Sequence, residues 1–358
     1  MDGLRTIIML TLYKTLSGDF KSVDILLSGC SRLIFTMGGH IWPPSELSYD
    51  RTPGASPLAF TPSIAQSHLR SLFWICYLTD KEMSLRTGRP PTINDNECDL
   101  TPGDEDIEQI PTESISGLAS NDFCFLGEIR LSVIKSKTYN LLYSARAHRK
   151  TDAELLQIIR ELDDDLEKWR VSLLPEYRPA TSFSQEPPFR SDEELRAIIL
   201  RLEYHRCMAI IHQASSRCRA WMENTSGVME GVSSSLELAV QASRCSLFHL
   251  YQSRGILVKR CFWFIIFFPI SSLMTIFCNI LQNPLHPHRA KDLELLQQAP
   301  AIAQEVLLDQ EHKHVRDIEH IKSVEELMIL MGKLAKSAIE KATRESRHGS
   351  DSTRSLME

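Results

Sequence analysis

Residues 70–102 read RSLFWICYLTDKEMSLRTGRPPTINDNECDLTP, and they contain the most informative local pattern of the chain. Apolar residues recur through the first half at helical spacing, and Gly88 can take the left-handed backbone conformation that ends many helices. Pro90 and Pro91 then favour extended chain. The stretch therefore predicts a long helix that begins after Pro62, ends at Gly88 and is followed by an extended loop. The residues expected to pack in that helix are Leu72, Phe73, Ile75, Cys76 and Met83.

Asp80 lies within this apolar helix, where an unpaired carboxylate would be costly to bury. Arg89 follows in the turn just beyond the helix end, and a guanidinium group can bond a carboxylate with two parallel hydrogen bonds. We therefore predict an Asp80–Arg89 ion pair that holds the helix end to its loop.

The same helical periodicity extends along the rest of the chain. Thr151, followed by Glu154 three residues on, is a capping-box start for a helix that Pro175 ends. Strand patterns are absent, which predicts an all-α fold: a large, bundle-like, multi-helix regulatory domain with long irregular loops. The other predicted helices span about 4–17, 19–37, 63–86, 122–148, 195–210, 233–254, 256–281, 290–308 and 321–342.

Segments rich in Pro, Ser and Gly interrupt the helices at 42–62, 90–114 and 175–192. The last 16 residues are polar and lack an apolar period. The predicted organisation is one helical domain over residues 1–342 and a disordered tail over residues 343–358. Because no 20–50-residue repeat is visible, a helical solenoid is not expected.

Composition argues against direct nucleic-acid binding by this chain. The formal net charge is −6 over 358 residues, and no basic run stands out, whereas phosphate contacts need clustered Lys and Arg. The nine cysteines include no C-x-x-C pair, so neither a zinc finger nor a thioredoxin-type motif is present. The chain alone is therefore expected to bind neither zinc nor specific DNA.

No catalytic signature occurs, so an enzyme is not predicted. Several groups of His, Asp and Glu are candidate metal sites, but each is better explained as a solvated face, an acidic loop or a core histidine, because complete ligand sets are missing. The predicted metal and cofactor content is therefore none. These candidate groups are His286 with His288, His312 with His314, Asp163–Asp165, Asp95 with Glu97 and Asp99, and His205 with His212.

Residues 262–281 read FWFIIFFPISSLMTIFCNIL and carry no charge. Twenty apolar residues can span a bilayer, and Lys259 and Arg260 flank them. Pro269 and the later Ser, Thr and Asn residues instead favour a buried helix, which would cover the apolar faces of its neighbours. We therefore predict a core helix and no membrane span.

The 70–102 stretch resembles the fungal-specific transcription factor domain, the regulatory middle region of fungal binuclear-zinc-cluster transcription factors. The family motif has an Arg before an aromatic pair, then an acidic-basic pair, a Ser and a Gly-Arg-Pro. The residues that match it as a structural motif are Arg70, Phe73, Trp74, Asp80, Lys81, Ser84, Gly88, Arg89 and Pro90, followed by the acidic loop residues Asp95 and Asp99.

Weaker similarities lie on both sides of this motif. A Leu…Leu…Trp…Leu-Pro pattern covers residues 162–175, a Tyr-His helix covers 201–213, and Asp292 matches within 283–296. Upstream, the chain has Gly38-Gly39-His40 where the family has Gly-Leu-His. The family's N-terminal cluster of six cysteines and two zinc ions is not found, so the chain is interpreted as beginning inside the regulatory region.

The resemblance implies a nuclear protein that modulates DNA-templated transcription. The implied partners are the transcription machinery or other regulatory proteins, a small-molecule effector, a second copy in a homodimer, and DNA only through the missing module. A helical enzyme and a single-span membrane protein of unknown activity are the alternatives.

Overall fold

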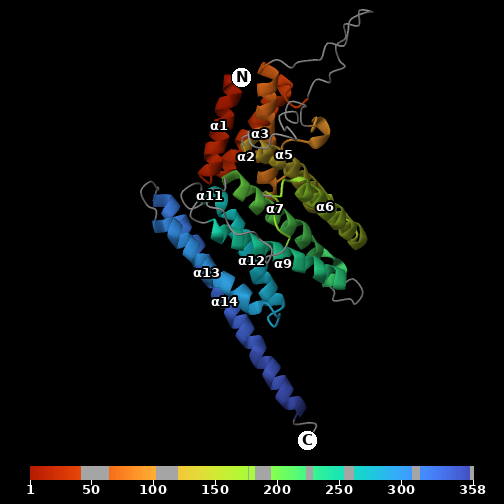
Figure 1. Cartoon of the computed structure of the whole chain (residues 1–358), viewed down its shortest axis with the longest axis vertical. Helices are drawn as coiled ribbons and strands as arrows, with labels where there is room; N and C mark the ends of the chain where they lie inside the picture. Colours follow the sequence, from red (N-terminus) through yellow and green to blue (C-terminus); the bar gives the residue numbers. More distant parts are fainter. Residues whose placement is uncertain are drawn as a thin grey trace, which may run out of the picture. The chain divides into compact units, whose positions relative to one another are not determined.

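The computed structural model describes residues 1–41, 64–101, 120–175, 177–181, 195–222, 229–253, 262–308 and 315–354. Every regular element in these ranges is helical, so the predicted all-α class is confirmed (Figure 1). The predicted loop at 42–62, most of the predicted loops at 90–114 and 175–192, and His312 and His314 lie outside the described ranges. The described chain divides into two compact units, Met1–Arg149 and Lys150–Glu358. The predicted single domain over 1–342 stays a prediction.

The first unit packs four helices around one core. They are α1 (Asp2–Leu16), α2 (Phe20–Met37), α3 (Ile64–Thr87) and α5 (Ser120–Thr138). Gly18, at φ 75°, makes the turn between α1 and α2, and Asp19 caps α2 by accepting from the Ser22 amide at 3.2 Å. The buried core includes Leu4, Ile8, Cys30, Ile34, Leu72, Phe73, Trp74, Cys76, Tyr77, Ile93 and Ile129.

The helix predicted over 122–148 is shorter in the structure. α5 gives way to a single π-helical turn at Tyr139–Tyr143 and a short 3-10 turn at Ala147–Arg149. Ser144 breaks the ladder in an extended conformation, and its amide bonds the Tyr139 carbonyl at 2.9 Å. A wide turn of this kind marks a local change in helical winding that side-chain spacing alone does not reveal.

The second unit is built on α7 (Leu195–Gln213) and α9 (Met229–Gln252), which pack against each other. α6 (Asp152–Ser172) begins with the predicted capping box, since Thr151 and Glu154 bond each other's backbone amides. Trp169 near the end of α6 stacks on Tyr204 of α7 at 5.8 Å between ring centres. The Leu…Leu…Trp pattern is therefore a packing face.

The apolar segment 262–281 forms two helices instead of the single predicted one. α11 (Phe262–Ile265) ends before Ile266, which is the N-cap of α12 (Phe267–Gln282). Pro269 explains the break, because its ring would clash with the Ile265 carbonyl in a continuous helix. α12 packs one face against α9, α14 (Val315–Arg354) and α13 (Arg289–Leu308), while Met274 and Leu281 are exposed. The helix is therefore amphipathic and not buried all round.

No helix within the described ranges combines the length and the apolar character that crossing a membrane requires.

α14 continues to Arg354, through most of the segment for which the sequence predicted disorder. One i,i+4 contact crosses the start of this extension: Lys341 lies 3.9 Å from Glu345. Such pairs support a helix without any apolar period, which is why the apolar pattern underestimated its length.

A buried ion pair joins α9 to α13. Arg244 bonds Asp292 through two parallel hydrogen bonds of 2.7 and 2.9 Å, and the Asp292 side chain is 0% exposed. Arg244 also reaches Glu237 at 2.8 Å. Although burial acts against its charge, hydrogen bonds and charge interactions with Asp292 and then Glu237 raise the pKa of Arg244. The two helices are therefore fixed in register by a geometry that tolerates little displacement.

His249 is buried on α9, and it makes a hydrogen bond with the backbone of Ile198. Burial and then the charges of Arg201 and His205 together lower the pKa of His249 to about 3. The folded chain therefore keeps this imidazole neutral over the physiological range.

The Asp292 carboxylate can be tested against a matched carboxylate on the same arginine. Asp292→Ala should lower the free energy of unfolding by roughly 3–5 kcal/mol, because it leaves Arg244 buried without its main counter-charge. Glu237→Ala removes a carboxylate that is 43% exposed and should cost less than about 1 kcal/mol. Urea denaturation measures both, and equal losses would contradict the buried-pair assignment.

His249 should make the folded chain sensitive to acid. Its folded pKa lies below the unfolded value, so the unfolded chain binds a proton first as the pH falls. The stability contribution is present above about pH 6.5 and is lost as the pH falls toward 3, by at most about 1.4 kcal/mol per pH unit. His249→Gln should flatten this dependence in thermal melts, whereas His148→Gln, at an exposed histidine, should leave it as steep as in the parent.

Candidate functional site

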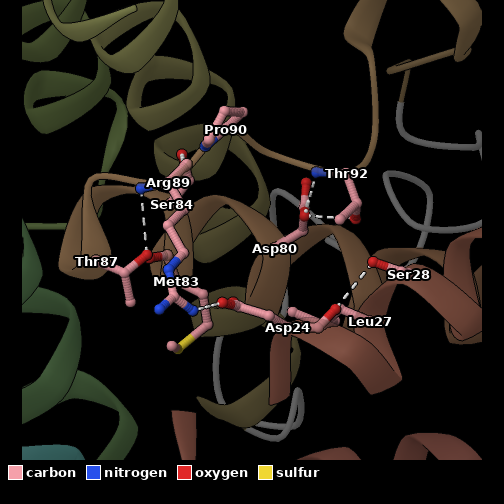
Figure 2. A pocket seen from close by; sticks show the side chains of 10 residues that line it. All are labelled: Asp24, Leu27, Ser28, Asp80, Met83, Ser84, Thr87, Arg89, Pro90 and Thr92. Atoms are coloured by element: carbon pink, nitrogen blue, oxygen red, sulfur yellow. Dashed lines mark hydrogen bonds and ion pairs between the residues drawn. The ribbon is translucent and has the colours of Figure 1, made fainter. Parts of the chain in front are cut away.

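Asp80 accepts three hydrogen bonds from the loop that follows α3. The donors are the Thr92 amide at 2.7 Å, the Thr92 hydroxyl at 2.7 Å and the Ile93 amide at 3.1 Å. The loop leaves the helix through Gly88, at φ 70°, as the sequence predicted. Asp80 thus holds the returning chain by its backbone, and the motif works as a clasp between α3 and residues 88–101 (Figure 2).

Lys81 supplies the counter-charge, a role that the sequence-based interpretation assigned to Arg89. Its ammonium lies 3.3 Å from Asp80 and 3.1 Å from Asp95, and it donates to the Ile93 carbonyl. The side chain is 1% exposed and lies over the Tyr77 ring at 4.8 Å from the ring centre. The signal for this arrangement was visible as two adjacent charges, Asp80 and Lys81, within an apolar helix.

Arg70 anchors the far end of the same loop. Its guanidinium donates to the Asp99 carbonyl, to the Thr101 carbonyl at 3.2 Å and to the Gly39 carbonyl at 3.3 Å. It also lies over the rings of Phe73 and Trp74, 4.7 and 4.6 Å from their centres. Arg70 therefore connects three segments: the C-terminal end of α2, the helix α3 and the loop that follows α3. Trp74 is one of the two aromatic rings against which its guanidinium packs.

The Gly38-Gly39-His40 corner meets this anchor. A Cβ atom at Gly39 would lie 2.9 Å from the Leu69 side chain, so glycine permits this close approach to α3 without a shift of Leu69. The His40 carbonyl accepts from the Asp99 amide at 2.9 Å. Burial, and then the charge of Arg70, lowers the pKa of His40, which favours a neutral ring at this corner.

The predicted Asp80–Arg89 ion pair is wrong. Arg89 pairs instead with Asp24 on α2, and its side chain is 57% exposed. The left-handed Gly88 turns the chain so that Arg89 points toward α2, whereas Asp80 faces the loop residues beyond Pro90 (Figure 2). Ser84 stabilises this turn by donating to the Arg89 carbonyl at 2.9 Å.

A pocket of about 210 Å³ lies beside this turn. Leu27, Met83 and Pro90 supply apolar surface, and Asp24 and Arg89 supply charge (Figure 2). The hydroxyl groups of the lining already bond the chain: Ser28 donates to the Asp24 carbonyl at 2.9 Å, and Thr87 donates to the Met83 carbonyl at 2.8 Å. The pocket could therefore hold a small molecule, chiefly through the Asp24–Arg89 pair.

A second buried charge cluster links α3 to α5. Glu82 bonds Arg86 at 2.5 Å and Lys135 at 2.7 Å, and all three side chains are almost fully buried. No sequence pattern pointed to this cluster, because Glu82 and Lys135 are 53 positions apart. It fixes α5 against the same helix that carries the clasp.

The charged side chains of the clasp bond the backbone of the returning loop. In the described ranges, no three His, Cys, Asp or Glu side chains are grouped to hold a metal ion. Of the candidate histidines, His212 is buried and bonds Ser235 at 2.9 Å and Asp163 at 3.2 Å. The predicted absence of metal and cofactor stays a prediction.

The fold and the clasp together define a helical module in which buried charged side chains bond the backbone of the same chain. Residues 3–171 match the family model described as the fungal specific transcription factor domain. The resemblance carried by the Arg70–Pro90 motif is therefore confirmed for this part of the chain.

Curated relatives are named as transcription factors. An ABC-transporter-regulating transcription factor of Aspergillus fumigatus is 30% identical over 292 residues, which is 77% of this chain and 31% of that protein. A protein of the same name from Aspergillus oryzae is 32% identical over 239 residues, 63% of this chain and 26% of that protein. The Fusaridione A cluster transcription factor of Fusarium heterosporum is 24% identical over 277 residues, 75% of this chain and 48% of that protein.

The chain thus spans less than a third of the length of the two Aspergillus relatives. No solved structure matches the chain. The relatives' names indicate regulators of transcription and not enzymes, and neither the enzyme alternative nor the membrane alternative is favoured by the comparisons.

The contacts of Asp80 and the Arg89–Asp24 pair should contribute very different amounts to the free energy of unfolding. Asp80→Ala removes three accepted hydrogen bonds and a counter-charge of the buried Lys81, and should cost roughly 3–5 kcal/mol of unfolding free energy. Arg89→Ala breaks an exposed pair and should cost less than about 1 kcal/mol. Chemical denaturation measures both variants. Equal losses of unfolding free energy would instead support the Asp80–Arg89 pair, which the structure does not contain.

Proposed function

We propose that this chain is the regulatory region of a fungal transcription factor and acts in the nucleus. The match of residues 3–171 to the fungal specific transcription factor domain carries this proposal, because the matched range includes the whole clasp. The names of the curated relatives support the same class of activity. The role is to modulate transcription through contacts with regulatory proteins or an effector, without chemistry of its own.

DNA contact belongs, in this proposal, to a separate module. The chain's net charge of −6 gives it no electrostatic attraction for phosphate. The described helices also use several of their buried cations internally, as Arg70 and Lys81 show. Regulation through this chain then depends on bringing it to a promoter by other means.

The pocket beside the Asp24–Arg89 pair is the proposed effector position. It lies between α2 and the end of α3, so a bound molecule would contact both the exposed ion pair and the apolar side chains of Leu27 and Met83. A small polar molecule with an apolar part fits this mixture of surfaces. Binding at this pocket would change the position of α2 relative to the clasp.

A tethering experiment tests the regulatory role. The full chain is fused to an unrelated DNA-binding domain upstream of a reporter gene in a fungal host. The fusion should change reporter expression several-fold relative to the DNA-binding domain alone, and the untethered chain should leave no footprint on duplex DNA at physiological salt.

Two variants separate regulation from simple expression of the fusion. Asp80→Ala should abolish the effect because the clasp is lost, whereas Arg89→Ala should keep the fold and report on the pocket alone. An unchanged reporter level with a folded, nuclear parent fusion would reject the proposed function.

A further inference from the structure

Two cysteines from different helices meet in the core of the first unit. Cys30 lies on α2 and Cys76 lies on α3, and these two helices pack against each other. Both thiols are free and almost fully buried, at 0% and 2% exposure, within the same apolar cluster. The two thiols are hydrogen-bonded to each other, so their sulfur atoms face one another across the contact between the helices.

The two thiols differ in acidity. The hydrogen bond with Cys76, and to a smaller degree the one with Thr11 on α1, lowers the pKa of Cys30, although burial acts against it. The Thr11 hydroxyl lies 3.8 Å from the Cys30 sulfur. The hydrogen bond with Cys30, and then burial, raises the pKa of Cys76. Cys30 is therefore the thiol that ionises first, while Cys76 keeps its proton.

A single buried cysteine usually packs as a small apolar side chain and stays inert. The Cys30–Cys76 pair differs, because an oxidised product formed at one thiol lies beside a second thiol. A sulfenic acid in that position condenses to a disulfide. Cys218 in the second unit gives the contrast, since it is also 0% exposed but the charges that act on it are those of Asp152 and Arg217.

The pair lies one helical turn from the clasp. Cys76 precedes Asp80 by four residues, which puts both on one face of α3. Cys30 precedes Ser31, whose hydroxyl lies 2.9 Å from the hydroxyl of Thr92, and Thr92 in turn donates to Asp80. A bond between the two sulfur atoms would therefore fix α2 to α3 beside the loop that the clasp holds.

We propose that Cys30 and Cys76 form an oxidation site at which a hydroperoxide produces a disulfide between α2 and α3. The position of α2 on α3 then depends on exposure of the chain to peroxide. The proposal stands independently of the transcriptional function.

The chemistry uses one peroxide molecule for each pair. The Cys30 thiolate attacks one peroxide oxygen and the O–O bond breaks, which gives a sulfenic acid and a hydroxide that takes up the proton released by Cys30. The Cys76 sulfur then attacks the sulfenic sulfur, the S–O bond breaks, and the leaving hydroxyl takes the Cys76 proton. Two electrons pass from the sulfur atoms to the peroxide, and the products are one disulfide and two water molecules.

Burial of the pair sets the rate of this reaction. Peroxide reaches the thiols when the helices open locally, so the reaction is slower than that of an exposed thiol. The S–S bond is about 2.05 Å long, which is shorter than a hydrogen-bonded thiol contact, so the two side chains must move together when it forms.

Peptide mapping of the full chain tests the site. The exposed Cys278 is replaced by serine to prevent links between chains, and the folded protein is treated with hydrogen peroxide. Remaining thiols are alkylated after denaturation, and the chain is digested without reduction. Mass spectrometry should find Cys30 linked to Cys76 in most chains, whereas Cys218 should remain a thiol and be alkylated. The linked chain should melt about 5 °C or more above the reduced chain.

Two further variants test the order of the steps. Cys76→Ala removes the second thiol, so Cys30 should gain oxygen as sulfenic and sulfinic acid instead of forming a link. Cys30→Ala removes the more acidic thiol and should leave Cys76 reduced, as Cys218 is. Circular dichroism before treatment confirms that each variant is folded.

If Cys30 and Cys76 of the folded, peroxide-treated chain stay as open to alkylation as Cys218, the proposal is overturned. Linkage of either residue mainly to other cysteines would also overturn it, as would a Cys30–Cys76 link in a chain that melts no higher than the reduced one.

Discussion

The fold of the first unit depends on the need to bond one buried carboxylate. Asp80 lies inside an apolar helix, and its cost of burial is offset only when nearby donors surround it. Those donors are backbone amides of residues 92 and 93, so the chain must turn at Gly88 and return along the helix. Lys81 and Arg70 can then reach the same returning segment. Hydrophobic burial alone would favour many positions for this loop, whereas directional bonds to a carboxylate favour one.

The second unit meets a similar constraint with a different geometry. Arg244 and Asp292 are both buried, and their paired hydrogen bonds connect two helices instead of a helix and a loop. Buried ion pairs contribute little net stability, because desolvation of both ions opposes their attraction. Their value here lies in the specific alignment of α9 with α13, which apolar contacts would allow to slide. Each unit therefore contains a charged contact that selects one packing among several of similar apolar area.

Local patterns in the sequence predicted the helices well. The features that the sequence did not predict depend mainly on contacts between residues far apart in the chain. The spacing of Leu155, Leu162 and Trp169, the Thr151 cap and the Gly88 stop all depend on neighbours within a few residues, and each is found in the structure. The Arg89 partner could not be read in this way, because Asp24 is 65 positions away. The buried role of Lys81 was missed for a related reason: a lysine in a helix is ordinarily assigned to the surface. The break at Ile266 depends on a local rule, because Pro269 interrupts the helix three residues before its own position.

The burial of Lys81 has a consequence for chemical modification of the chain. Its amine is enclosed by Asp80, Asp95 and the Tyr77 ring, so an acyl donor cannot reach it in the native state. Acetylation would remove the positive charge and leave two carboxylates facing each other across a buried gap. The folded domain therefore protects this lysine from acetyltransferases. A chain acetylated at Lys81 would lack the ammonium that lies between Asp80 and Asp95 and donates to the Ile93 carbonyl.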